Sequence, residues 1–385
     1  MNHLLPRTVI VLGLASLLND VASEMITPLL PLFLTATLGA GPAVVGLVEG
    51  GAEAAVSVLK LFSGWLADRG VGHKRLVVSG YTLSNLVRPL IALAFGWVWV
   101  LAMRVLDRVG KGLRTAPRDA LIAAAVDPSI RGRAFGFHRA MDHAGATLGP
   151  LIAFALLQWG GLEMTQVFWA SVVPGLLVVL LLVFGPQPPP VPRALPAAPL
   201  RWRALDLKLR RLVIAAGVLA LATTPEAFLV LWAFQGGLAI AWVPLIWAAA
   251  SLVKALVSIP AGIAADRWGR LQVVRLGWSL RVVLLLALAL IPAGGLTTWG
   301  LFLVYAAALA MTEGAERALI GDLAPADQKG TLFGLYHLLS GLLVLPGAVL
   351  LGLLWERIGM ESAFAAAAGL TALAAGYLLR EVEQR

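Results

Sequence analysis

The segment GWLADR, residues 64–69, recurs as GIAADR at residues 262–267, which is 198 positions further along the chain. A second pair of segments, GRAFG at 132–136 and GTLFG at 330–334, is separated by the same 198 residues. A common offset at two separated places indicates an internal repeat. We therefore interpret the chain as two similar halves.

The composition places both halves in a membrane. Of 385 residues, 59% are hydrophobic and only 13% are charged, against about 25% charged in soluble domains. A bilayer core about 30 Å thick takes about 20 helical residues per crossing. The chain contains twelve apolar segments of suitable length, at 7–35, 43–67, 75–95, 97–125, 132–158, 163–185, 211–235, 238–265, 271–293, 297–323, 328–355 and 360–380. This predicts an all-α integral membrane protein with twelve transmembrane helices, and it argues against a soluble enzyme.

A proline-rich stretch divides the twelve segments into six and six. The run GPQPPPVP follows the sixth segment, and prolines in such a run cannot continue a helix. We predict an N-terminal six-helix bundle at 1–185, a proline-rich cytoplasmic linker at 186–210 and a C-terminal six-helix bundle at 211–385.

The net charge of +9 is explained by the orientation of the chain in the membrane. The Lys and Arg residues are scattered in short loops rather than gathered in a basic stripe, so no nucleic-acid partner is expected. These cations concentrate in alternate loops, which by the positive-inside rule predicts that both termini are cytoplasmic. We expect the protein in the cell membrane. The apolar stretch at the N-terminus has no convincing cleavage site, so we expect a retained first helix.

The residue types present also limit which cofactors and partners the chain can bind. The chain has no cysteine, which excludes a disulfide framework and a thiolate metal site. Its seven methionines and five histidines are not spaced as a metal cluster, and no GxxxxGK[ST] nucleotide loop is present. We expect no cofactor, no metal site and no catalytic residues. Nothing in the sequence indicates an obligate dimer, so we expect a monomer.

Three motifs make the chain resemble the major facilitator superfamily over nearly its whole length. GWLADRGVGHKR, repeated as GIAADRWGR, is similar to the G-x-x-x-D-R-x-G-x-[RK] signature of that superfamily. Arg108-Val-Gly-Lys111-Gly112 resembles its antiporter motif R-x-x-Q-G, with Lys in place of Gln. The segment from Gly145 through Gly149 to Pro150 resembles the exporter motif G-x-x-x-G-P, without the usual following glycines.

The resemblance implies a fold of two pseudo-symmetric six-helix bundles around a central site. It also implies that the duplicated signature latches the bundles on the inner side, with each aspartate against a helix N-terminus and each arginine paired with an acid. Its glycines then allow close helix approach. The gating residues implied in this way are Gly64, Asp68, Arg69, Gly145, Gly149, Pro150, Gly262, Asp266 and Arg267.

Ionisable residues inside the apolar segments are costly to insert, so each is a functional candidate. Asp20 and Glu24 lie four residues apart on one face of the first predicted helix. Glu53 lies in the second segment and is a candidate proton carrier. His138 and Asp142 lie one turn apart in the fifth segment, where they form either a proton relay or a satisfied hydrogen bond at a packed interface.

The fourth segment carries a basic stripe. Arg104, Arg108, Lys111 and Arg118 recur at intervals of four, three and seven residues, which places them along one face of a helix. Such a stripe must face water or acids. Arg108 is a candidate for coupling, because an arginine beside a carboxylate makes protonation of that acid respond to substrate. Arg114 and Arg118 we interpret as snorkelling to the headgroups.

The second half has fewer charges. By the layout that the resemblance implies, the seventh and tenth helices line the cavity, so Glu226 and Glu313 are second-choice ligands. Glu313 and Arg317 are four residues apart, and a local ion pair explains them equally well.

Together with these charges, the resemblance implies a secondary transporter, a proton-coupled antiporter that exports a small organic molecule by alternating access. The acid that carries the proton is left open between Glu24, Glu53 and Asp142. Two alternatives remain: a proton symporter that imports a small metabolite or anion, which the basic stripe favours, and a lipid flippase.

Overall fold

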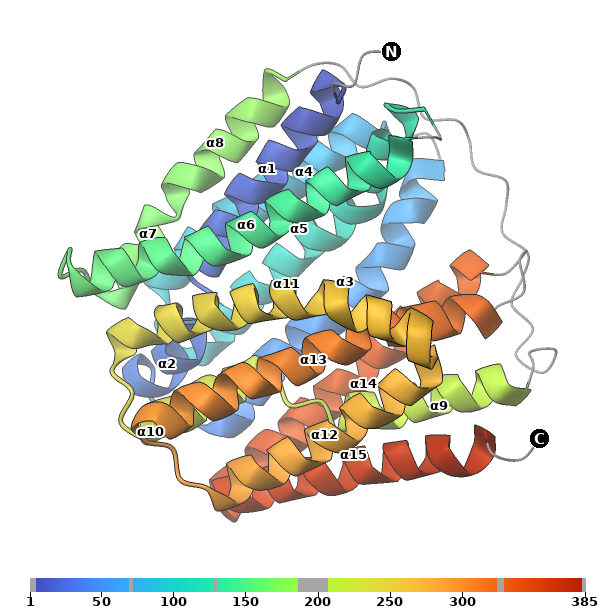
Figure 1. The fold of residues 1–385 in the computed structure, drawn as a ribbon. Coiled ribbons are helices and arrows are strands. Elements are labelled where there is room, and N and C mark those ends of the chain that lie inside the picture. Colours follow the sequence, from blue (N-terminus) through green and yellow to red (C-terminus); the bar gives the residue numbers. More distant parts are fainter. Residues whose placement is uncertain (1–4, 69–71, 128–129, 186–206, 324–328, 383–385) are drawn as a thin grey trace. The chain divides into compact units, whose positions relative to one another are not determined.

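The computed structural model describes residues 5–68, 72–127, 130–185, 207–323 and 329–382. Throughout this part of the chain the ordered elements are helices (Figure 1). Each of the twelve predicted apolar segments coincides with one helix or with consecutive helices. The first six correspond to α1 (Arg7–Glu24) with α2 (Leu30–Leu32) and the π-helix η1 (Phe33–Thr37), α3 (Pro42–Asp68), α4 (His73–Val87) with the 3₁₀ helix η2 (Pro89–Leu93), α5 (Trp97–Ala124), α6 (Arg131–Gln158), and α7 (Met164–Ala170) with α8 (Val172–Val183).

The second six repeat this pattern. They correspond to α9 (Leu207–Leu221) with α10 (Glu226–Gln235), the 3₁₀ helix η5 (Ile240–Trp242) with α11 (Val243–Trp268), α12 (Arg270–Leu290), α13 (Gly295–Leu323), α14 (Lys329–Arg357) and α15 (Met360–Val382). Within the described chain, nine segments are long and apolar enough to cross a membrane. The helix α5 is not among them, because seven ionisable residues interrupt its apolar sequence.

Corresponding helices of the two halves are broken at a Thr-Pro pair. A proline lacks an N–H and its ring clashes with the carbonyl four residues earlier. Pro28 accordingly follows the end of α1 at Glu24, and Pro225 follows the end of α9 at Leu221. The break in the second half leaves Glu226 at the first position of α10, where the helix dipole favours a negative charge.

The chain forms two compact units that do not coincide with its two sequence halves. Unit 1 contains residues 1–33, 55–195 and 240–248, and unit 2 contains 34–54, 196–239 and 249–385. Each unit therefore includes one short segment from the other half of the sequence. The six-helix boundaries at 1–185 and 211–385 remain a prediction, and most of the proposed linker lies outside the described residues.

Each unit has its own apolar core. In unit 1, α4 packs on α5, and α1 packs on α6 and α8; Val9, Tyr81, Ile122 and Val178 meet there. In unit 2, α12 packs on α13 and α15, and α9 packs on α14 and α15. The centre of that packing is formed by Val274, Trp278, Ala315, Ile320 and Ala374.

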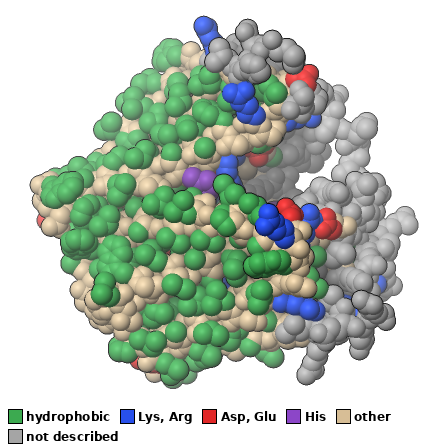
Figure 2. All heavy atoms as spheres, viewed as in Figure 1, with side chains coloured by type: hydrophobic (Ala, Val, Ile, Leu, Met, Phe, Trp, Pro, Cys, Tyr) green, Lys and Arg blue, Asp and Glu red, His purple; other side chains and the backbone are tan. Residues whose placement is uncertain are grey.

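Large apolar side chains are also exposed. Hydrophobic residues spread over the face shown in Figure 2, with few charged residues among them. On α8, Val173 is 65% exposed and Leu176 55%, and on α11, Leu256 is 66% exposed and Ile259 72%. Contiguous exposed apolar surface marks contact with lipid or protein, and here it lies on helices long and apolar enough to span a bilayer.

Candidate functional site

The basic helix α5 holds one buried carboxylate, and its partner is an arginine that the sequence analysis did not single out. The Nε of Arg88 lies 2.8 Å from Oδ1 of Asp107, and the two side chains are 5% and 0% exposed. Arg88 also donates to the carbonyl and side-chain oxygens of Asn19, at 3.2 and 3.0 Å, and to Oδ1 of Asn85 at 3.2 Å. The pair therefore joins α1, α4 and α5.

A second arginine of α5 is buried in the same interface. Arg114 donates from Nη1 to the hydroxyl of Ser84 at 2.7 Å, and its guanidinium carbon lies 4.5 Å from the centre of the Tyr81 ring. Only 4% of Arg114 is exposed, so the prediction that it snorkels to the headgroups was wrong. A hydroxyl and an aromatic face replace water around this cation.

The rest of the stripe surrounds Asp107 with positive charge. Arg104 is buried, Arg108 is half-buried and Lys111 is exposed, and all three make polar interactions. The charges of Arg104 and Arg108 act on Asp107 together with that of Arg88. Arg118 pairs locally with Asp119 at 2.9 Å. This part of unit 1 thus holds more cations than anions.

The candidate acid Asp142 is shared by α1 and α6. Its Oδ1 accepts a hydrogen bond of 2.5 Å from the hydroxyl of Ser16, 126 positions earlier in the chain. Its Oδ2 lies 3.5 Å from Nδ1 of His138 and 3.8 Å from Nη1 of Arg139. The structure therefore brings the predicted pair His138 and Asp142 together, and it adds Ser16 and Arg139, which the sequence analysis had not named.

Two glycines of the predicted exporter motif set the α1–α6 distance. A Cβ added at Gly145 would lie 2.5 Å from the carbonyl oxygen of Leu17, and one at Gly149 would lie 2.7 Å from that of Val21. Both contacts are with backbone, which cannot move aside as a side chain can. Pro150 follows within α6 and is buried. The close approach brings Asp142 within reach of Ser16.

The acids of α1 continue this cluster. Asp20 accepts a hydrogen bond of 3.0 Å from Asn19, and its charge interacts with those of Asp142 and Glu24. Glu24 accepts a hydrogen bond of 3.0 Å from the indole N–H of Trp247. Trp247 comes from the 240–248 segment, so the second half of the sequence contributes to this site in unit 1. Here we call Ser16, Asp20, Glu24, His138 and Asp142 the acidic cluster.

Other candidates lie elsewhere. Glu53 is exposed and belongs to unit 2, so the structure does not join it to the acidic cluster within one unit. Glu226 pairs with Lys254 of α11, with Oε1 and Oε2 at 2.8 and 3.0 Å from Nζ. Glu313 and Arg317 form the local pair that their spacing allows, at 2.6 Å, and both side chains are exposed.

The more enclosed acid of α13 is Glu316, which the sequence analysis did not select. It accepts hydrogen bonds from the indole of Trp278 at 2.6 Å and from the hydroxyl of Tyr336 at 3.3 Å. The positive charge of Arg281, 7% exposed, acts on it. Its position matches that of Arg118 after the 198-residue offset, and Tyr336 matches His138 in the same way. The 198-residue repeat was therefore the sequence signal that could have identified Glu316 as a candidate.

The predicted gating signature is only partly described. The side chains of Gly64 and Asp68, and the whole of Arg69, lie outside the described residues. In the second copy, Asp266 lies 3.9 Å from Arg270, which also pairs with Asp322 and donates to the carbonyl of Ala318. Arg270, three residues after Arg267, thus joins α12 to the end of α13.

The role of Gly262 in close helix approach remains a prediction. A Cβ added at Gly262 would have no heavy atom of the described chain within 4 Å. Among the described residues, no three or more His, Asp or Glu side chains lie together so that they could hold a metal ion.

Comparison with known proteins gives a consistent assignment. The sequence model of the Major Facilitator Superfamily matches residues 12–246 and 236–385. An uncharacterized MFS-type transporter of Methanocaldococcus jannaschii is 31% identical over 367 residues, covering 94% of this chain and 91% of the relative. The multidrug resistance protein MdtH of Photorhabdus laumondii is 36% identical over 136 residues, which cover 35% of this chain and 33% of that protein.

The fold is shared with solved transporters. The bacterial homolog of the human lysosomal transporter Spinster, in an inward-facing and occupied conformation, superposes with a TM-score of 0.82 at 17% identity, covering 98% of this chain and 96% of that chain. These matches confirm the predicted all-α architecture of the membrane protein. The chain belongs to the major facilitator superfamily of membrane transporters.

Proposed function

We propose that this protein is a proton-coupled antiporter that exports a small organic molecule, with Asp142 as the proton-carrying acid. The supporting observation is the position of Asp142, whose two oxygens contact α1 through Ser16 and face His138 and Arg139 on α6. A carboxylate only accepts hydrogen bonds, whereas a protonated carboxyl also donates one. Protonation of Asp142 therefore changes the contacts between two helices.

The neighbouring acids give a physical reason why a proton and a substrate would be exchanged. Asp142, Asp20 and Glu24 interact electrostatically along one side of α1, and like charges held close together repel. Either a proton or a positively charged group of the substrate relieves this repulsion, so each competes with the other. The hydrogen-bond partner of Glu24 is the buried indole of Trp247, and aromatic rings favour organic cations.

The similarity to MdtH supports the export direction, as do the antiporter-like Arg108 and the exporter-like Gly145, Gly149 and Pro150. MdtH is described as a multidrug resistance protein, and its matched region covers 35% of this chain. We further propose that the protein is a monomer in the cell membrane, with cytoplasmic termini and two six-helix halves that open alternately to either side.

The test uses the purified protein in proteoliposomes with an imposed pH gradient and a panel of small organic cations and neutral drugs. We expect a proton gradient to drive substrate against the direction of proton flow. Asp142→Asn should lose this gradient-driven flux and retain substrate exchange without a gradient. Asp119→Asn, which alters an acid 44% exposed and paired with Arg118, is the matched control and should keep both activities.

Two results would contradict the proposal. Full gradient-driven flux in Asp142→Asn would remove this residue as the proton carrier. Substrate movement in the same direction as protons would favour the second candidate, a proton symporter for an anionic metabolite. The observation behind that candidate is the excess of cations on α5, where Arg104, Arg108 and Lys111 accompany the buried Arg88–Asp107 pair.

A further inference from the structure

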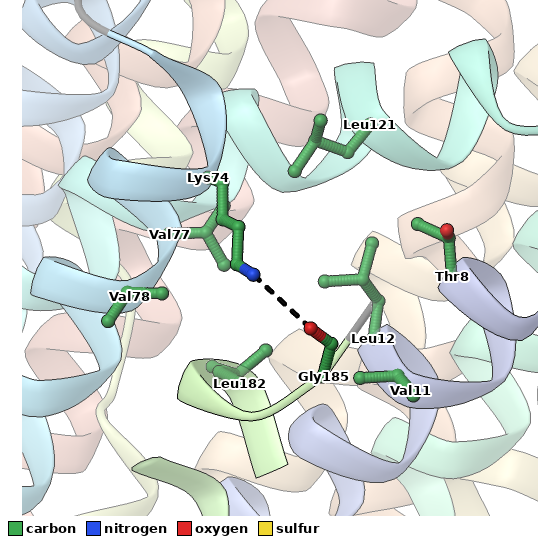
Figure 3. Close-up of a pocket in the computed structure, with 9 residues that line it drawn as sticks. All are labelled: Thr8, Val11, Leu12, Lys74, Val77, Val78, Leu121, Leu182 and Gly185. Atoms are coloured by element: carbon green, nitrogen blue, oxygen red, sulfur yellow. Dashed lines mark hydrogen bonds between the residues drawn. The ribbon is translucent and has the colours of Figure 1, made fainter. Parts of the chain in front are cut away.

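One surface of unit 1 has cations at one end and apolar side chains along the rest of it. No residue of the acidic cluster lines this surface. At the start of α4, a narrow crevice lies among α1, α4, α5 and the end of α8 (Figure 3). There Lys74 donates from Nζ to the carbonyl of Gly185 at 3.3 Å. An ammonium has three N–H donors, so this bond leaves two of them to point elsewhere.

The crevice adjoins a larger groove that also includes Lys74. The groove has a volume of about 650 Å³ and lies along α4 beside the end of α8. Its lining consists of Lys74, Arg75, Val78, Ser79, Thr82, Leu83, Leu86 and Val183. Among these described residues there are two cations and no acid.

The residues that line the groove change from charged to mainly apolar along α4. Lys74 and Arg75 lie in the first turn, and the later positions carry mainly apolar groups as far as Leu86, which is 64% exposed. The hydroxyl of Ser79 donates back to the carbonyl of Leu76 at 3.2 Å, so its hydrogen-bonding need is met within the helix. From Arg75 to Leu86 the helix rises about 16 Å, at about 1.5 Å per residue.

We propose that this groove binds one anionic phospholipid, with the phosphate on Lys74 and Arg75 and an acyl chain along Val78, Leu83 and Leu86. The length supports a lipid rather than a soluble ligand, because half of a bilayer core about 30 Å thick is about 15 Å. The charge supports an anionic headgroup, since basic pockets between membrane helices hold such lipids. The exposed apolar end at Leu86 suits a chain that continues into the bilayer.

The experiment measures lipid binding to the full-length protein by native mass spectrometry from detergent micelles. The probes are phosphatidylglycerol and phosphatidylcholine with identical acyl chains. We expect phosphatidylglycerol to bind more tightly, and the double variant Lys74→Ala, Arg75→Ala to weaken that binding about thirtyfold. The matched control is Arg131→Ala, Arg133→Ala, which removes two exposed cations from the first turn of α6 and should leave binding unchanged.

A second variant separates the acyl contact from the charge. Leu83→Trp fills the groove without altering its charge, and it should lower the affinity for phosphatidylglycerol while the thermal midpoint is preserved. Equal binding of the two lipids, or equal loss in the test and control double variants, would overturn the proposal. So would displacement of phosphatidylglycerol by glycerol phosphate at comparable concentration, because the site would then recognise a soluble phosphate alone.

Discussion

Arg88 and Asp107 form a buried ion pair of 2.8 Å that ties the end of α4 to the middle of α5. Both charges are withdrawn from water, and Nη1 of Arg88 donates to the side-chain oxygens of Asn19 and Asn85. A pair of this kind adds little net stability relative to a well-packed apolar pair, but removing one partner strands the other charge. Its contribution is to specify how α1, α4 and α5 meet.

We therefore predict that Arg88→Leu lowers the free energy of unfolding by about 3–5 kcal/mol, because Asp107 is left buried without its partner. Thermal unfolding of the purified protein measures this as a lower midpoint. The double variant Arg88→Leu, Asp107→Leu should recover most of the loss. The control Arg131→Leu removes an exposed arginine and should change the midpoint little. A double variant as unstable as the single one would show that the charge pair is not the cause.

The second prediction concerns the close contact of α1 and α6. Gly149→Ala places a Cβ 2.7 Å from the carbonyl oxygen of Val21, so the helices must separate at a cost of about 1–3 kcal/mol. Gly136→Ala on the same helix meets open space and should be neutral or stabilising by up to about 1 kcal/mol. Thermal midpoints of the two variants, measured side by side, test the difference. Equal midpoints would mean that α1 and α6 tolerate a wider spacing.

A third prediction addresses the ion pair at the break before α10. Glu226→Lys places two cations together and should reduce transport and stability, and Lys254→Glu should do the same with two acids. The exchanged double variant restores opposite charges. Its recovery should be partial, because a lysine at the first position of α10 opposes the helix dipole by about 0.3–1 kcal/mol. Transport rates and thermal midpoints of the wild type, the two single variants and the exchanged double variant test this prediction. No recovery in the exchanged protein would argue against a simple pair.

Two of the acids of α13, Glu313 and Glu316, provide a fourth prediction. Glu316→Leu leaves the indole N–H of Trp278 and the hydroxyl of Tyr336 without their acceptor, at about 1–3 kcal/mol for each buried group. Glu313→Leu loses only an exposed pair with Arg317, worth at most about 1 kcal/mol. Denaturation of the two variants under identical conditions should rank Glu316→Leu as clearly less stable. The reverse order would show that enclosure of Glu316 does not determine its role.

The successes and failures of the sequence analysis follow from the range over which each signal acts. The apolar segments predicted the positions of all twelve single helices or groups of consecutive helices, because hydropathy and helix length are local properties. The spacing of Glu313 and Arg317 allowed their pairing, since both lie on one helix. The same reasoning overlooked Arg88, which stands alone within an apolar segment and has its partner on another helix. It also assigned Arg114 to the headgroups, because nothing in the local pattern indicates Tyr81 and Ser84.

The sequence by itself determined that this chain is a helical membrane protein with an internal repeat, because the bilayer imposes a length and an apolarity that each helix must meet alone. Hydropathy alone left 7–35 and 211–235 as single segments, whereas the structure ends α1 and α9 four residues before a proline. Only the tertiary structure decided which charges meet. Ser16 reaches Asp142, Arg88 reaches Asp107 and Trp247 reaches Glu24 through helix packing, which depends on the shapes of distant segments and leaves no periodic trace in the chain.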